Sequence, residues 1–208
     1  MLNKIDLDSF VETVSRQESF TLLGHSIPDG DSIGAVTAMT WVMRNLGKDV
    51  TAVFEDEIPA MYQFLNGIDN IRPVSDCPKL YDCLIYLDCA NPERVGDKLG
   101  QLLPKTGTII NIDHHISNTR FGNVNVVDPN ASSTCEIIFR LLKKMNLPLT
   151  VDIATPLYCG ILMDTGSFKY SNTAPSTHRI AAELLEIGID QDLVRTSLFE
   201  SKTKVELA

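Results

Sequence analysis

The 208-residue sequence contains no apolar run that approaches the roughly 18 residues expected of a membrane-spanning helix. Its first residues, MLNKIDLDSF, lack the apolar core of a secretory signal peptide. Cysteine is scarce, with five residues and no C-x-x-C pair, which argues against a disulfide framework and against a zinc ribbon. We therefore expect a cytoplasmic protein with no membrane association, whose cysteines fill the core.

Basic residues are also few. The chain has 18 Lys and Arg against 27 Asp and Glu, and its formal net charge is −9. Proteins hold long nucleic acids mainly by neutralising phosphates with basic side chains. This chain is expected to repel a long polyanion, so phosphate chemistry would require a local site at which metal ions reverse the charge.

Apolar strands alternate with helical segments along the chain. Strands that are apolar throughout, separated by helices, are typical of a parallel sheet covered on both faces. The sequence thus predicts an α/β fold with a largely parallel five-stranded sheet and helices on both faces. The predicted strands are residues 19–24, 48–55, 82–91, 106–115 and 122–128, with a further short strand at 168–172. The predicted helices are 5–16, 32–47 (capped by Ser32), 59–67, 132–146, 151–166 and 175–188, and a last helical stretch begins near Asp190.

Acidic and histidine residues gather where three of these strands end. The loop HSIPDGDSIG follows the first strand, the third strand runs into Asp88, and the fourth runs into Asp113, His114 and His115. Ligands of open α/β sheets collect at the carboxyl ends of the strands. Carboxylates and imidazoles are suitable ligands for hard or borderline cations, so these segments predict a metal site.

The first loop does not match three common ligand-binding motifs. A P-loop requires a Lys that does not follow Gly30, and the glycines have the wrong spacing for a dinucleotide fingerprint. An EF-hand that started at Asp29 would need acidic or amide ligands where Ile33 and Thr40 stand. These motifs are therefore excluded.

A site for two metal ions remains. Such a site needs a carboxylate that bridges the ions, together with terminal carboxylate and imidazole ligands. Asp88 is placed to bridge, and Asp29 and Asp31 can each serve a different ion. With Asp164, these four carboxylates balance two divalent cations, whereas without cations they would repel one another.

Four segments, HSIPDGDS, LDCAN, NIDHHISN and GILMDTGSF, resemble in this order the motifs of the DHH phosphoesterase superfamily. The resemblance covers about residues 20–190 and is greatest for the bacterial branch of bifunctional oligoribonucleases and adenosine bisphosphate phosphatases, the nanoRNases. It implies hydrolysis of short oligoribonucleotides to 5′-mononucleotides, and of 3′-phosphoadenosine 5′-phosphate, by a water activated by two metal ions. Alternatives are a pyrophosphatase or cyclic-dinucleotide phosphodiesterase of the same superfamily, and a metal-loaded binding module without activity.

The resemblance also implies roles for the site residues. The cofactors would be two manganese ions, with magnesium or cobalt as substitutes. His115 would face the scissile phosphate, and Asp113 would orient the imidazoles or the attacking water. The implied metal ligands are His25, Asp29 and Asp88 for one ion and Asp31, Asp88, His114 and Asp164 for the other.

Two further segments have both a structural and a functional interpretation. Ser132, Ser133 and Thr134 open a predicted helix, where they would either cap the helix or receive a substrate phosphate at its N-terminus. Arg120 follows the Asp-His-His loop and would be either a solvated side chain or a contact to the phosphate.

Members of the resembling branch continue into a second domain with a Gly-Gly-Gly-His motif, which this sequence lacks. The expected organisation is a DHH catalytic domain at residues 1–190 and the start of a connecting helix at residues 191–208, as in an excised domain, with a naturally short protein as the alternative. The substrate partner would be a short oligonucleotide or nucleotide, and a homodimer is left open.

Overall fold

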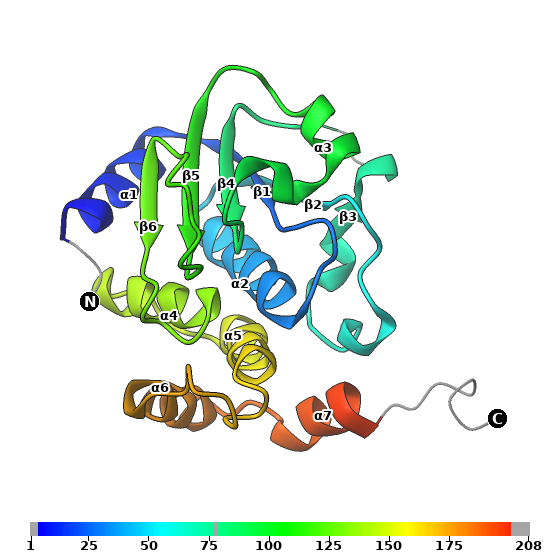
Figure 1. Ribbon diagram of the computed structural model, residues 1–208, viewed down its shortest axis with the longest axis vertical. Coiled ribbons are helices and arrows are strands. Elements are labelled where there is room, and N and C mark those ends of the chain that lie inside the picture. Colours follow the sequence, from blue (N-terminus) through cyan, green and yellow to red (C-terminus); the bar gives the residue numbers. More distant parts are fainter. Residues whose placement is uncertain (1–3, 77–78, 201–208) are drawn as a thin grey trace.

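A computed structural model describes residues 4–76 and 79–200 (Figure 1). These residues form one six-stranded sheet with the order β3-β2-β1-β4-β5-β6, and every pairing in it is parallel. The α/β class and the parallel sheet are as predicted. The strands are β1 (Ser19–Leu23), β2 (Asp49–Phe54), β3 (Ile71–Pro73), β4 (Cys83–Leu87), β5 (Thr108–Asp113) and β6 (Val124–Val127).

The predicted strand count was wrong in two places. The sheet has a sixth strand, β3, which pairs with β2 at one edge. It has only three residues and ends on Pro73, so it carries no apolar pattern, and an edge position is where a strand tolerates proline. Residues 168–172 form turns rather than a strand, and Ser167 and Phe168 have φ values of 59° and 64°.

Helices cover both faces of the sheet. Figure 1 shows α4 and α5 side by side near α2, with α6 and α7 on the far side of α5 from the sheet. The predicted helix at 59–67 is only a 3-10 turn at Ala60–Tyr62 followed by turns, and a second 3-10 turn, Ile68–Asn70, comes after it. A π-helical turn, Thr196–Glu200, follows α7, and residues 201–208 of the predicted connecting helix lie outside the described residues. The helices are α1 (Lys4–Arg16), α2 (Gly30–Asn45), α3 (Asp97–Leu102), α4 (Thr134–Lys144), α5 (Val151–Asp164), α6 (Pro175–Glu186) and α7 (Gln191–Arg195).

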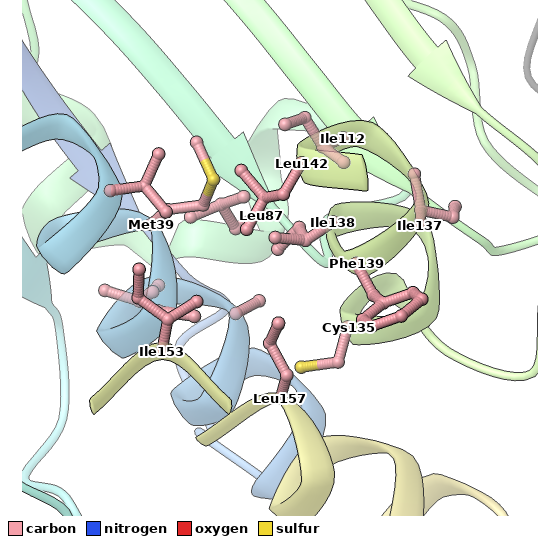
Figure 2. Close-up of a cluster of buried hydrophobic side chains, with 14 of the residues drawn as sticks. Met39, Leu87, Ile112, Cys135, Ile137, Ile138, Phe139, Leu142, Ile153 and Leu157 are labelled. Atoms are coloured by element: carbon pink, nitrogen blue, oxygen red, sulfur yellow. The ribbon is translucent and has the colours of Figure 1, made fainter. Parts of the chain in front are cut away.

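The core consists of two apolar layers, one on each face of the sheet. Successive strand residues point to opposite faces, so Leu22 joins the larger layer and Leu23 the smaller one. Figure 2 shows part of the larger layer, where Met39 of α2, Leu87 of β4 and Ile138 of α4 lie together. Each Å² of buried apolar surface contributes about 25 cal/mol to the stability of the fold. Burial on both faces of the sheet therefore holds the strand ends that carry the polar residues in place.

The cysteines of the described residues are core residues, as predicted. Cys83, Cys89, Cys135 and Cys159 are buried free thiols, and burial raises the pKa of each above its ordinary value. Cys77 lies outside the described residues. Within the described part of the chain, no helix is both long and apolar enough to cross a membrane.

Helices α2 and α5 cross in close contact at Gly34. A Cβ atom at Gly34 would lie 2.4 Å from the carbonyl oxygen of Pro156 and 3.1 Å from Sγ of Cys135. Because a backbone carbonyl cannot rotate away, Gly34→Ala must separate the helices, and we expect a loss of about 1–3 kcal/mol in unfolding free energy by urea denaturation. The matched control is Gly100→Ala in α3, where a Cβ meets nothing within 4 Å. It should stabilise the protein by about 0.5–1 kcal/mol, and equal effects of the two variants would contradict this packing.

The order of the strands determines where ligands can enter. From β1 the chain moves to β2 and β3 on one side of β1, and then returns to β4 on its other side. The loops that leave the carboxyl ends of β1 and β4 therefore diverge, and such a topological switch point is the usual ligand crevice of an open α/β sheet.

Candidate metal centre

The polar residues that the sequence places after β1, β4 and β5 meet at this switch point. Asp29 caps the N-terminus of α2, because its Oδ1 accepts hydrogen bonds from the amides of Asp31 (3.1 Å) and Ser32 (3.0 Å). The prediction that Ser32 caps this helix was wrong, since Ser32 lies inside the helix and its Oγ accepts the amide of His25 at 3.2 Å. The loop after β1 is thereby folded against the start of α2.

The first cluster comprises His25, Asp29 and Asp88. Nε2 of His25 lies 3.4 Å from Oδ2 of Asp29 and 3.5 Å from Oδ2 of Asp88. His25 and Asp88 are buried, whereas the side chain of Asp29 reaches the surface. One ligand atom from each residue lies within 4.8 Å of the others, which is close enough to hold one cation.

The second cluster comprises Asp31, His114 and Asp164, with Asp88 beside it. Nε2 of His114 lies 3.9 Å from Oδ2 of Asp31 and 3.6 Å from Oδ2 of Asp164. It also lies 3.7 Å from Oδ1 of Asp88, the oxygen that does not face His25. The two oxygens of Asp88 thus face two different clusters, which is the geometry required of a bridging carboxylate.

The backbone at Asp88 is strained. Asp88 follows β4 with φ 61°, a left-handed conformation that few residues other than glycine adopt readily. Its amide donates to the carbonyl of Ile112 at 3.0 Å, and its side chain accepts the hydroxyl of Thr134 at 2.9 Å. Strained residues of this kind occur mainly at functional sites, where the surrounding structure enforces the conformation.

The clusters carry more negative charge than buried groups tolerate without a cation. Burial, together with the charges of Asp88 and Asp164, raises the pKa of Asp31 well above its ordinary value. Burial also raises the pKa of Asp164 to about 6, with a further rise from the charge of Asp88. Burial alone would lower the pKa of His25, but hydrogen bonds and charges from Asp29 and Asp88 raise it to about 9. Two divalent cations would satisfy this set of donors, so the residues present fit such a cofactor.

These shifts predict the pH dependence of the metal-free protein. Between pH 6 and the ordinary value of 3.8, folded Asp164 binds a proton that the unfolded chain does not, so stability rises as the pH falls. The raised pKa of His25 acts in the same direction. Protonated His25 stabilises the folded state fully below pH 6.5, and this stabilisation is lost as the pH rises through about 9.

In EDTA, the melting temperature should therefore be higher at pH 5 than at pH 8. With manganese the order should reverse, because metal ligands must be deprotonated. Thermal unfolding at both pH values, with and without manganese, measures this. A metal-free protein that is less stable at pH 5 than at pH 8 would contradict the arrangement of charges.

His115 forms a third group with Asp88 and His114, since its Nδ1 lies 3.6 Å from Oδ1 of Asp88, but its shorter contact is to a different carboxylate. Its Nδ1 lies 2.7 Å from Oδ1 of the fully buried Asp113, whose Oδ2 accepts the side-chain amide of Asn118 at 2.6 Å. The hydrogen bond to Asp113 raises the pKa of His115. The Nδ1 atom is thus engaged within the protein, which leaves Nε2 of this partly exposed ring for a ligand.

Asn118 is not among the site residues predicted from the sequence. Its Nδ2 also lies 2.7 Å from Oδ1 of Asn111 and 3.2 Å from the carbonyl of Cys89, so it ties β5 to the loop after β4. Its Oδ1 accepts the amide of Arg120, whose side chain is exposed. Its place three residues after His115 is the sequence signal for this role.

The three residues predicted to contact phosphate at the start of α4 make hydrogen bonds within the protein. Ser133 caps the helix, with its Oγ accepting the amide of Glu136 at 3.0 Å. The amide and the hydroxyl of Ser132 donate to Oε2 of Glu136 at 3.2 and 2.5 Å. Thr134 donates to two carboxylates of the site. All three residues are buried.

A family model described as "DHH family, N-terminal domain" matches residues 19–161. This chain belongs to the DHH family. The matched DHH segment contains every residue of the two clusters except Asp164, which follows it at the end of α5.

Two similar proteins are both longer than this chain. It is 39% identical over 166 residues to the bifunctional oligoribonuclease and PAP phosphatase NrnA of Thermus thermophilus, covering 79% of this chain and 49% of the relative. The NrnA of Bacillus subtilis is 30% identical over 200 residues, covering 94% and 61%. The chain thus spans about half to three-fifths of the length of these relatives.

A solved structure has the same fold as this chain. It is that of an exopolyphosphatase-related protein from Bacteroides fragilis, and it superposes with a TM-score of 0.91 at 24% identity, covering 100% of this chain and 64% of that one.

Proposed function

We propose that this chain is the catalytic part of a metal-dependent phosphoesterase that hydrolyses short oligoribonucleotides to 5′-mononucleotides and removes a phosphate from 3′-phosphoadenosine 5′-phosphate. The observation that carries the proposal is the position of Asp88 between the two clusters, with one oxygen facing His25 and the other facing His114. Membership of the DHH family and the names of the NrnA relatives support the choice of substrates.

The proposed cofactors are two manganese ions, for which magnesium or cobalt can substitute. The mixed set of carboxylates and imidazoles favours manganese over magnesium. His25, Asp29 and Asp88 would hold one ion, and Asp31, His114, Asp164 and again Asp88 the other. When bound, such ions polarise the phosphate oxygens and acidify the attacking water.

The residues of the chain supply the rest of the reaction. The oxygen of water forms a bond to phosphorus and gives up a proton, the bond from phosphorus to the 3′ oxygen breaks, and that oxygen takes up a proton and becomes a hydroxyl. His115 is placed to contact the phosphate or to give this proton from Nε2, because Asp113 holds Nδ1. Hydrogen bonds from His115 and Asn118 offset the effect of burial and lower the pKa of Asp113, so Asp113 remains charged beside the imidazole.

The charge of the chain supports a preference for short substrates. A net charge of −9 leaves little basic surface along which a long strand could bind. The buried free thiols are compatible with the reducing cytoplasm, where we place the protein. Residues 1–190 would form the catalytic domain, and the additional length of the relatives would include a second domain that grips the substrate.

The proposal is tested by one manganese-supplemented assay of the purified protein with four substrates: a dinucleotide, 3′-phosphoadenosine 5′-phosphate, pyrophosphate and a cyclic dinucleotide. We expect mononucleotides from the first and orthophosphate from the second, both abolished by EDTA. Orthophosphate from pyrophosphate, without mononucleotides from the dinucleotide, would identify a pyrophosphatase instead. Manganese binding with no turnover of any substrate would indicate a binding module.

A further inference from the structure

We propose that Thr134 is a positioning residue for the second metal ion and not a substrate contact. The proposal rests on the proposed function, because it assumes that the clusters hold metal ions. Thr134 would fix two of the three carboxylate oxygens that face His114, so that the second cluster is held ready to bind a cation.

Both hydrogen bonds of Thr134 go to oxygens of the second cluster. Its amide lies 2.6 Å from Oδ2 of Asp31, and its hydroxyl lies 2.9 Å from Oδ1 of Asp88. These are the two oxygens that lie 3.9 and 3.7 Å from Nε2 of His114. Thr134 is fully buried, so water cannot replace either donor.

Asp31 is held at both of its oxygens by the start of α4. Its Oδ1 accepts the amide of Cys135 at 2.9 Å, while Oδ2 accepts the amide of Thr134. Hydrogen bonds from N–H groups to ionised carboxylates are about twice as strong as neutral ones, and the positive end of the helix dipole adds to them. These contacts favour the charged form that a metal ligand requires, against the burial that raises the pKa of Asp31.

The first cluster is held by a different helix. Oδ1 of Asp29 accepts two amides at the start of α2, which leaves its Oδ2 facing His25. The oxygen of Asp88 that faces His25 is Oδ2, which Thr134 does not touch. Each cluster therefore has its own helix N-terminus, and loss of the Thr134 hydroxyl should affect the second ion more than the first.

The segment that carries Thr134 is held in place through Ser132. The hydroxyl of Ser132 donates to the fully buried Glu136, which also accepts the hydroxyl of Thr177 at 2.9 Å and forms an ion pair with Arg140. The carbonyl of Ser132 accepts the side-chain amide of Asn172 at 3.0 Å. A side chain supported in this way can hold a carboxylate in one orientation.

The experiment is a calorimetric titration of metal-free protein with manganese, comparing wild type with Thr134→Val. Valine has the shape of threonine but cannot donate to Asp88. We expect two equivalents in wild type. In the variant, one equivalent should bind about 10–100-fold more weakly, the range for the loss of a partner that orients a metal ligand. The other equivalent should stay within about threefold of wild type.

Two control variants separate positioning from a loss of stability. Thr134→Ser retains the hydroxyl and should restore both affinities. Ser133→Ala removes the helix cap next to Thr134 without touching Asp31 or Asp88, so it should lower the melting temperature in EDTA yet leave manganese affinity unchanged. The rise in melting temperature on adding manganese should shrink in Thr134→Val and not in Ser133→Ala. If the valine variant does not fold, Thr134→Ala provides the same comparison.

Two results would overturn the proposal: wild-type affinity for both equivalents in the variants that lack the hydroxyl, or equal weakening in Ser133→Ala. Failure of the proposed reaction would appear instead in the four-substrate assay and would leave the manganese titration unchanged. Absence of manganese binding by wild type would refute both proposals together, whereas the first two results would refute only the role of Thr134.

Discussion

Replacing Asp88 should remove both metal ions and abolish hydrolysis. Its Oδ2 lies 3.5 Å from Nε2 of His25 in the first cluster, and its Oδ1 lies 3.7 Å from Nε2 of His114 in the second. Asp88 is therefore the carboxylate that serves both clusters. Loss of the shared carboxylate also leaves three carboxylates for two divalent cations. Metal analysis after gel filtration in manganese should find about two equivalents in wild type and none in the variant.

The choice of substitution matters because Asp88 has φ 61°. Alanine in this left-handed conformation costs about 1–2 kcal/mol, so Asp88→Ala mixes backbone strain with the loss of the carboxylate. Asparagine tolerates the conformation and has the same size, so Asp88→Asn removes only the charge. An Asp88→Asn protein that retains both manganese ions would refute the assignment of Asp88 as the bridge.

The second large effect is expected at His115. His115→Ala should keep both metal ions and yet slow hydrolysis by about 10²–10⁴-fold, the usual contribution of a positioned acid or base. The reason is that Nδ1 of His115 is engaged with Asp113 at 2.7 Å, whereas His114 directs Nε2 at three carboxylates. The rate of mononucleotide release and the manganese content should be measured on the same preparation.

The adjacent histidine is a matched control. His114→Ala removes a side chain of the same kind one residue away, and it should lose one manganese equivalent in addition to activity. If His115→Ala also loses an equivalent, while His114→Ala retains both, the two histidines have been assigned the wrong way round. If neither variant loses activity, the site does not catalyse this reaction.

The location of the site could be predicted because it depends on local signals. Apolar runs that end in Asp and His identify the carboxyl ends of β1, β4 and β5, and parallel strands bring those ends to one edge of the sheet. Strand β3 could not be predicted in this way, because three residues ending on Pro73 are held by pairing with β2 rather than by their own pattern.

The contacts of Thr134 could not be predicted from sequence either. Thr134 is separated from Asp88 by 46 residues and from Asp31 by 103, and only the packing of α4 against α2 and α5 brings them together. From sequence alone, Ser132, Ser133 and Thr134 form one group at the start of a helix. In the structure, the hydroxyls of Ser132 and Ser133 both contact Glu136, at its carboxylate and its amide, whereas that of Thr134 donates to Asp88.

Anomalous diffraction at the manganese absorption edge, from crystals grown with excess manganese, tests the shared carboxylate most directly. We expect two anomalous peaks about 3.5–4 Å apart, one on each side of Asp88 and each next to one of its oxygens. A single peak, or no peak within coordination distance of Asp88, would contradict the two-ion centre from which the proposed chemistry follows.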